Sequence, residues 1–162
     1  MNFAAKRLFL ILTFLVFFQI GCQENSAVKE VITADNHLSN DYFPVKAEIL
    51  SLTEYTKKDK NVKAYVVLTD NFGSQIKTPG IFRFELYERI AHSAEPKGKR
   101  IAIWDDIALK DASLNNSYWR DFLRAYQFSL PFESTNGQNY ILEVTFTNFD
   151  GTRLIDDYIL QL

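Results

Sequence analysis

The stretch YILEVTFT at residues 140–147, followed by NFDG at 148–151, is the clearest structural signal in the chain. Its first, third, fifth and seventh residues are Tyr, Leu, Val and Phe, whereas Thr occupies the sixth and eighth positions. Alternation of apolar and polar residues with a period of two predicts a half-buried β-strand. Asp-Gly is a strong turn signal between two strands of a hairpin. We therefore expect residues 154–162 to return as the partner strand, with a bulge or an edge position where Asp156-Asp157 interrupts the apolar pattern.

The same period of two, or a short β-branched run, recurs along most of the preceding chain. Only residues 111–122 have helical spacing, with Asp111 as a candidate cap. Many short strands separated by turns, with at most one short helix, predict an all-β fold, namely an antiparallel two-sheet sandwich of about seven strands. The predicted strands are 45–53, 62–69, 81–88, 100–109, 123–132, 140–147 and 154–162.

The other end of the chain carries a different signal. Lys6-Arg7 precedes a predominantly apolar run at 8–20, and Gly21 and then Cys22 follow it. A basic start, an apolar core of this length and a small residue describe a secretory signal. A run that spans a bilayer needs about 20 apolar residues, so the run at 8–20 is too short to do so.

This segment resembles a bacterial lipoprotein signal peptide, in which a small residue precedes a cysteine that is lipidated and becomes the new N-terminus. Gly21-Cys22 matches that motif, and Gln19 stands where the family usually has leucine. The resemblance implies cleavage after residue 21, lipid chains on Cys22 and a location in the cell envelope, facing out of the cytoplasm. Two or more chains anchor a protein stably to a membrane. An ordinary signal peptide with a chance cysteine, or an uncleaved anchor, is the alternative.

Composition supports an exported domain that depends on its core. Cys22 is the single cysteine, so a disulfide within the chain is excluded, while the chain has 14 Phe, 8 Tyr and 2 Trp, which bury large areas. The net charge of −2 becomes more negative when Lys6 and Arg7 leave with the signal, and a mildly acidic chain is poorly suited to nucleic acid. The predicted plan is a signal peptide at 1–21, a lipidated N-terminus and polar tether at 22–43, and the sandwich at 44–162.

Two short motifs resemble known sandwiches. Residues 137–144, with Asp150-Gly151 after them, look like the penultimate and last strands of an immunoglobulin-like domain. That resemblance gives Tyr140 the role of a corner tyrosine that hydrogen-bonds back to the chain. Residues 68–73, with Pro79-Gly80 before the next strand, resemble transthyretin-like sandwiches instead. Both resemblances imply a fold and neither implies an activity.

Catalytic and metal-binding motifs are missing from the sequence. It has no P-loop, GxSxG, HExxH or paired CxxC, and its two histidines, His37 and His92, fall in predicted loops. We therefore predict no enzyme and no cofactor, with a small hydrolase as a remote alternative. Acidic residues of the kind that bind calcium cluster in two places, although turn chemistry and solvated strand ends account for them as well. These clusters are Asp105, Asp106 and Asp111, and Asp150, Asp156 and Asp157.

Aromatic side chains offer one candidate binding surface. Trp104, Tyr118 and Trp119 could form a platform for a sugar or a peptide, whereas packing against the core is the simpler interpretation, since tryptophan is usually mostly buried. A small basic group, Lys97, Lys99 and Arg100, falls in or next to a predicted loop and is expected to be solvated. The sequence therefore favours a non-enzymatic, lipid-anchored sandwich that binds another envelope component, with a carbohydrate- or calcium-binding module as the alternative.

Overall fold

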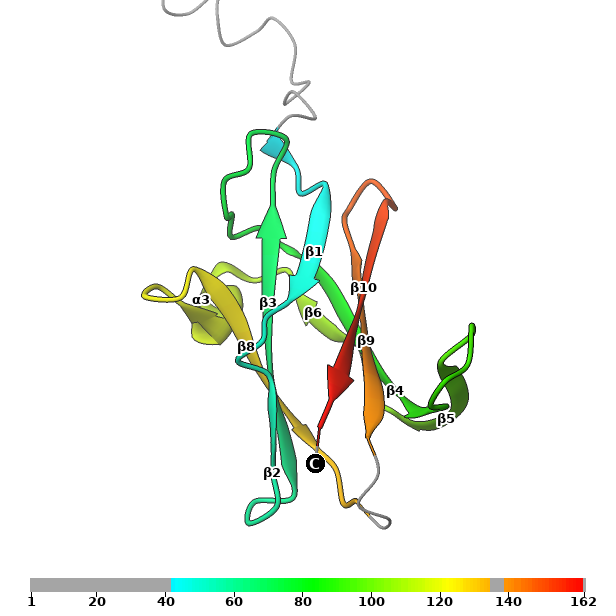
Figure 1. The fold of residues 1–162 in the computed structure, drawn as a ribbon. Coiled ribbons are helices and arrows are strands. Elements are labelled where there is room, and N and C mark those ends of the chain that lie inside the picture. The colour runs from blue at the N-terminus through cyan, green and yellow to red at the C-terminus, as the bar shows by residue number, and fades with distance from the viewer. Residues whose placement is uncertain (1–41, 135–138, 162) are drawn as a thin grey trace, which may run out of the picture. The chain divides into compact units, whose positions relative to one another are not determined.

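Residues 42–134 and 139–161 are described by the structure, a computed structural model, and within them the strands form two antiparallel sheets that pack against each other, with one short helix (Figure 1). All of these residues belong to the unit Ser39–Leu162. The predicted fold class is therefore confirmed. Further strands beyond the seven that we expected are short ones, which local sequence patterns rarely reveal.

In the first sheet the strand order is β1 (Lys46–Ile49), β3 (Asn61–Thr69), β8 (Ala125–Pro131) and β7 (Trp119–Arg120), and β2 (Glu54–Thr56) also pairs with β3. In the second sheet the order is β10 (Arg153–Leu160), β9 (Tyr140–Thr147), β4 (Gly80–Arg89) and β5 (Lys97–Ile103), and β6 (Ile107–Leu109) also pairs with β4. The long strands β3, β4 and β9 lie inside their sheets, so the outer positions belong to β1 with β2, to β7, to β10, and to β5 with β6.

The predicted hairpin of β9 and β10 is present. Its register runs without a shift from Thr147 opposite Arg153 to Tyr140 opposite Leu160. Gly151 takes a positive φ of 87° in the turn, where an L side chain would be strained. Of the two positions that we allowed for Asp156-Asp157, the structure shows the edge and not the bulge.

Aromatic rings join the two sheets in the core. Phe82 of β4 has its ring centroid 4.8 Å from that of Phe128 and 5.0 Å from that of Tyr126, and both of these residues lie on β8 of the other sheet. Phe82 also lies 4.9 Å from Phe146 of β9, and all four side chains are fully buried. Such pairs contribute about 0.5–1.5 kcal/mol each beyond their buried area. These aromatic side chains thus lie where the two sheets pack against each other.

The predicted strand 45–53 is wrong in length, because β1 ends at Ile49 and the backbone bond from the Leu50 N–H to the Tyr65 carbonyl of β3, at 2.8 Å, is the last before a turn. A turn follows, in which the Thr53 N–H donates to the Leu50 carbonyl at 2.9 Å. The buried Thr53 hydroxyl accepts the Tyr65 N–H of β3 at 3.0 Å. A side-chain oxygen takes the place of a backbone acceptor here, and pairing with β3 resumes only at β2.

The predicted strand 100–109 is likewise two strands, β5 and β6. Between them, the Asp106 carboxylate accepts two hydrogen bonds from the Arg83 guanidinium of β4, at 2.7 and 2.9 Å. The Trp104 indole N–H donates to the Pro131 carbonyl of the other sheet at 2.9 Å. These contacts turn the chain out of the sheet between the two strands.

The predicted helix is present but shorter than 111–122. It is α3 (Ala112–Tyr118), and Asp111 caps it as expected by accepting the Leu114 N–H at 2.8 Å. The helix ends there because Trp119 pairs with Tyr126 as part of β7, with their rings 5.1 Å apart and edge to face. Contacts with the neighbouring strand therefore outweigh the helical spacing of the last residues.

Candidate functional site

The first outer strand of the second sheet, β10, is closed by contacts to the first sheet. Its inward-facing Asp156 carboxylate accepts the N–H of Ile49, the last residue of β1, at 2.7 Å. Tyr158, two residues further on, donates its hydroxyl to the Ser51 carbonyl at 3.3 Å. Figure 1 shows β1 and β10 side by side at this corner of the sandwich. β1 of the other sheet therefore lies beside this edge, although β10, like β5, pairs with a strand on one side only within the described residues.

The opposite outer strand, β5, is open. It pairs with β4 along one side, and within residues 42–134 and 139–161 no strand pairs with its other side (Figure 1). The pairing with β4 shifts register on both sides of Tyr87. Bulges and lysines on an edge discourage indiscriminate strand pairing. A partner at this edge must therefore fit its irregular backbone and its charge.

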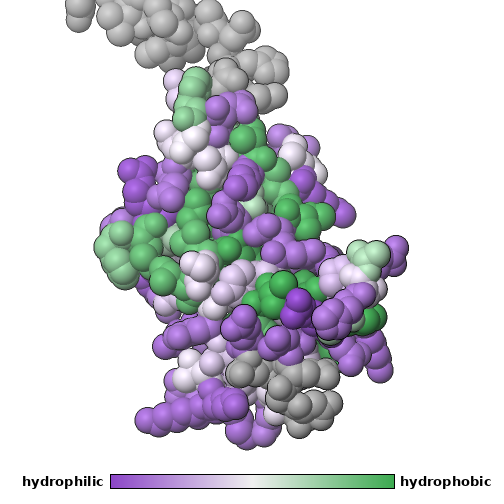
Figure 2. Space-filling model, in the orientation of Figure 1, coloured by the Kyte–Doolittle hydropathy of each residue, from purple (hydrophilic) through white to green (hydrophobic). Residues whose placement is uncertain are grey.

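Exposed isoleucines accompany the open edge. Ile101 and Ile103 on β5 have 43% and 51% of their surface exposed, and Ile90, just after β4, has 47%. β10 also presents outward isoleucines, Ile155 and Ile159. Figure 2 shows apolar residues as separate green patches in an otherwise hydrophilic surface on the face that carries β1 and β10. The two edges thus share exposed isoleucines and differ in that β1 of the other sheet lies beside β10.

A polar network crosses the outer face of the second sheet and ends at β5. Lys97 of β5 contacts Glu143 of β9 and lies 2.9 Å from Asp157 of β10. Burial works against its charge, but the two carboxylates outweigh burial and raise the pKa of Lys97. Among the β5 cations, Lys99 has no carboxylate close enough for an ion pair within the part of the chain that the structure describes.

A second, tighter group lies beside this network. Tyr87 donates its hydroxyl to Glu85, and Arg100 of β5 lies 3.2 Å from the same carboxylate. Burial raises the pKa of Tyr87 to about 12, and the hydrogen bond to Glu85 contributes to the shift. The same bond lowers the pKa of Glu85, and Arg100 lowers it further. Arg100 is therefore engaged, which leaves Lys99 as the available charge on the edge.

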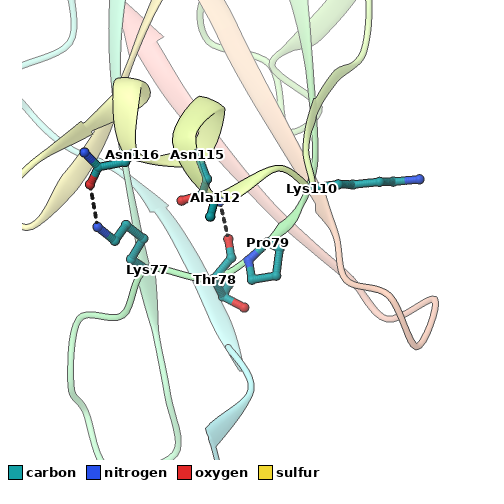
Figure 3. Close-up of a pocket in the computed structure, with 7 residues that line it drawn as sticks. All are labelled: Lys77, Thr78, Pro79, Lys110, Ala112, Asn115 and Asn116. Atoms are coloured by element: carbon teal, nitrogen blue, oxygen red, sulfur yellow. Dashed lines mark hydrogen bonds between the residues drawn. The ribbon is translucent and has the colours of Figure 1, made fainter.

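A pocket of about 410 Å³ lies beside α3, at a distance in sequence from β5 (Figure 3). Its wall is held by a buried amide: the Asn115 side chain donates to the carbonyls of Thr78 and Leu109 at 3.0 and 3.1 Å. The Asn115 side-chain oxygen lies 3.1 Å from the Tyr126 hydroxyl, and this hydroxyl donates to the Thr78 carbonyl at 2.8 Å. The pocket lining is Lys77, Thr78, Pro79, Lys110, Ala112, Asn115 and Asn116.

The side chains of the predicted aromatic platform pack against the core. Trp104, Tyr118 and Trp119 are all half-buried and pack against the buried cluster. The ring centroids of Tyr118 and Phe128 lie 5.3 Å apart, and the Trp104 indole N–H donates to the Pro131 carbonyl, as described above. Lys77 lies 5.7 Å from the centre of the Trp119 ring. This geometry adds no support for a sugar-binding surface.

The other candidate groups stay apart. In the described ranges no three His, Cys, Asp or Glu side chains come together as a metal site, so neither acidic cluster is assembled there. Asp106 is paired with Arg83, and Asp111 caps α3. His92 lies in the turn between β4 and β5 with a positive φ of 58°. Cys22, His37 and residues 135–138, which include the glycine of the Tyr140 corner motif, lie outside the described residues.

The sequence interpretation placed Lys97 and Lys99 in or beside a loop, whereas they lie on strand β5. Gly98 between two lysines suggests a loop, and the alternation of Ile101 and Ile103 was the signal that could have corrected this. The α3 pocket had no such signal, because Lys77 and Lys110 are brought together only by the fold.

The fold and its edges thus define a β-sandwich with one closed and one open outer strand in the same sheet. Comparison with protein-family models, with curated proteins and with solved structures finds no match. Among residues 42–134 and 139–161, no helix has the length and apolar character that crossing a membrane requires.

Proposed function

We propose that the protein is a non-enzymatic, lipid-anchored component of a bacterial cell envelope, and that its sandwich binds another envelope protein by strand addition at β5. The observation that carries this proposal is the open side of β5, a strand of seven residues. Strand addition supplies backbone hydrogen bonds for affinity and alternate side chains for specificity. The anchor rests on the resemblance of residues 1–22 to a lipoprotein signal peptide.

The chemistry of β5 describes the partner segment. Lys99 is a cation without an ion-pair partner in the described residues, and Ile101 and Ile103 are apolar and exposed. An extended segment in which acidic and aliphatic residues alternate would pair with both features. A second copy of β5 fits poorly, because it carries no acidic residue: antiparallel self-pairing would place Lys99 opposite Ile101 and Arg100 opposite the Arg100 of the other copy.

The test is site-specific photo-cross-linking in cells, with the photoreactive residue at Lys99 or, as the matched control, at Lys58 in the exposed turn between β2 and β3. We expect one defined protein adduct at position 99 and none at position 58. The Cys22→Ser form should lose membrane association and most of the adduct. Equal adducts at both positions, or no adduct at position 99, would contradict strand addition.

The anchor is tested separately by the mass of the purified N-terminal peptide. A thioether-linked lipid on Cys22, with residues 1–21 removed, is the expected result. If the adduct at position 99 is retained while Cys22 carries no lipid, the binding proposal stands and the anchor is wrong.

A further inference from the structure

A different part of the molecule, the pocket beside α3, has the features of a ligand site that the proposed function does not use. It is formed by residues 77–79, before β4, together with the start of α3 and residue Lys110 (Figure 3). The Asn115 amide ties these two segments together through buried hydrogen bonds. The wall is therefore preorganised, and a ligand would not have to order it.

Three acceptors at this pocket are already occupied. The Thr78 carbonyl accepts from both Asn115 and Tyr126, and the Asn115 oxygen faces the Tyr126 hydroxyl. The Asn116 side-chain oxygen accepts from the Lys77 ammonium at 2.8 Å. The other polar side-chain groups of the lining are mainly donors: the remaining N–H groups of Lys77, the Asn116 amide nitrogen and the Lys110 ammonium, with the Thr78 hydroxyl as both donor and acceptor.

The charge at the pocket is uncompensated. Lys77 and Lys110 both line it, and neither has a carboxylate within ion-pair distance among the described residues. The nearest carboxylate in sequence, Asp111, is engaged in capping α3. In Figure 3 Lys77 points toward Asn116, while the Lys110 side chain extends away from the pocket into open space. Lys110 can thus turn toward a bound anion without breaking a contact.

The remaining lining is apolar. Pro79 and Ala112 line the space together with the two lysines. We infer that this pocket binds a compact organic carboxylate with a short apolar body, in which Lys77 and Lys110 hold the carboxylate and Pro79 and Ala112 contact the apolar part. Charge-assisted hydrogen bonds of this kind are among the stronger ones.

The test is a titration of the labelled protein with benzoate, followed by amide shifts in NMR spectra, with benzamide as the neutral match and inorganic phosphate as an anion without an apolar body. We expect benzoate to bind with a dissociation constant on the order of 1 mM, with shifts at residues 77–79 and 110–116. Benzamide and phosphate should each bind at least about fivefold more weakly.

Variants separate the contributions. Lys77→Gln and Lys110→Gln should each weaken benzoate binding by about fivefold to tenfold, whereas Lys58→Gln should leave it unchanged. Ala112→Phe fills the space and keeps both charges, so it should abolish binding while the spectrum of the rest of the domain is retained. Equal binding of benzoate and benzamide, equal binding of phosphate, or unchanged binding by either lysine variant would overturn the inference.

Discussion

The strands β10 and β5 end the same sheet in opposite ways. β10 pairs with β9 over its whole length without a register shift, and a carboxylate on its inner face holds the edge of the other sheet. β5 pairs with β4 through two register shifts, and no described strand pairs with its other side. Two side chains therefore tie the β10 edge to the first sheet, whereas β5 has an irregular backbone whose other side is open to a partner.

The largest expected effect is at the closed edge. Asp156→Ala removes the acceptor for the N–H of Ile49, a residue that is only 5% exposed. A buried donor left without a partner, together with the lost charged hydrogen bond, should reduce the free energy of unfolding by about 2 kcal/mol. Urea denaturation measures this. Asp156→Asn keeps an acceptor oxygen and should lose less; equal stability of the two variants would show that the bond does not close the edge.

A smaller effect is expected for the link between the two edges. Lys97→Met removes the cation that joins β5 to Glu143 and Asp157, and it should cost about 1 kcal/mol because the side chains are only partly shielded from solvent. The difference from wild type should shrink as salt is added. Lys99→Met, on the same strand without an ion pair, is the matched control and should leave the unfolding free energy unchanged.

The same variant has a predicted pH dependence. The pKa of Lys97 is raised in the folded protein, so its ion pairs stabilise the fold fully below the unfolded-state value of 10.5 and are lost as the pH rises through the folded value. The wild-type advantage over Lys97→Met should therefore be constant near neutral pH and disappear above pH 10.5. An advantage that instead grew in alkali would contradict the assignment of the network to Lys97.

Much of the fold could be predicted because its long strands and the hairpin turn follow from local sequence patterns. The alternation along β4 and β9 places Phe82 and Phe146 inside, and Asp-Gly marks the hairpin turn. The breaks could not be predicted, because each depends on a distant partner. Asp106 turns the chain by pairing with Arg83, and Thr53 does so by bonding to β3.

The candidate sites were harder to predict than the core. The tryptophans were singled out for their residue type, but their position against the core follows from strand order, which the sequence does not state. Lys99 was noticed as part of a basic group, and only the pairing of β5 with β4 shows that it lies on an open edge. The α3 pocket depends on Asn115, one of two consecutive asparagines, whose buried role has no local signature.

The smallest expected change in stability is also the sharpest test of the comparison. Ile101→Asp on β5 and Ile155→Asp on β10 each replace an exposed isoleucine on an outer strand of the same sheet, so both should stay within about 0.5 kcal/mol of the wild-type unfolding free energy. If β5 receives an acidic, aliphatic strand, the new carboxylate repels it, and Ile101→Asp alone should abolish the cross-link formed at position 99. Loss of the adduct in both variants would mean that the exposed isoleucines bind the partner as an apolar surface and that the open backbone of β5 is not what it recognises.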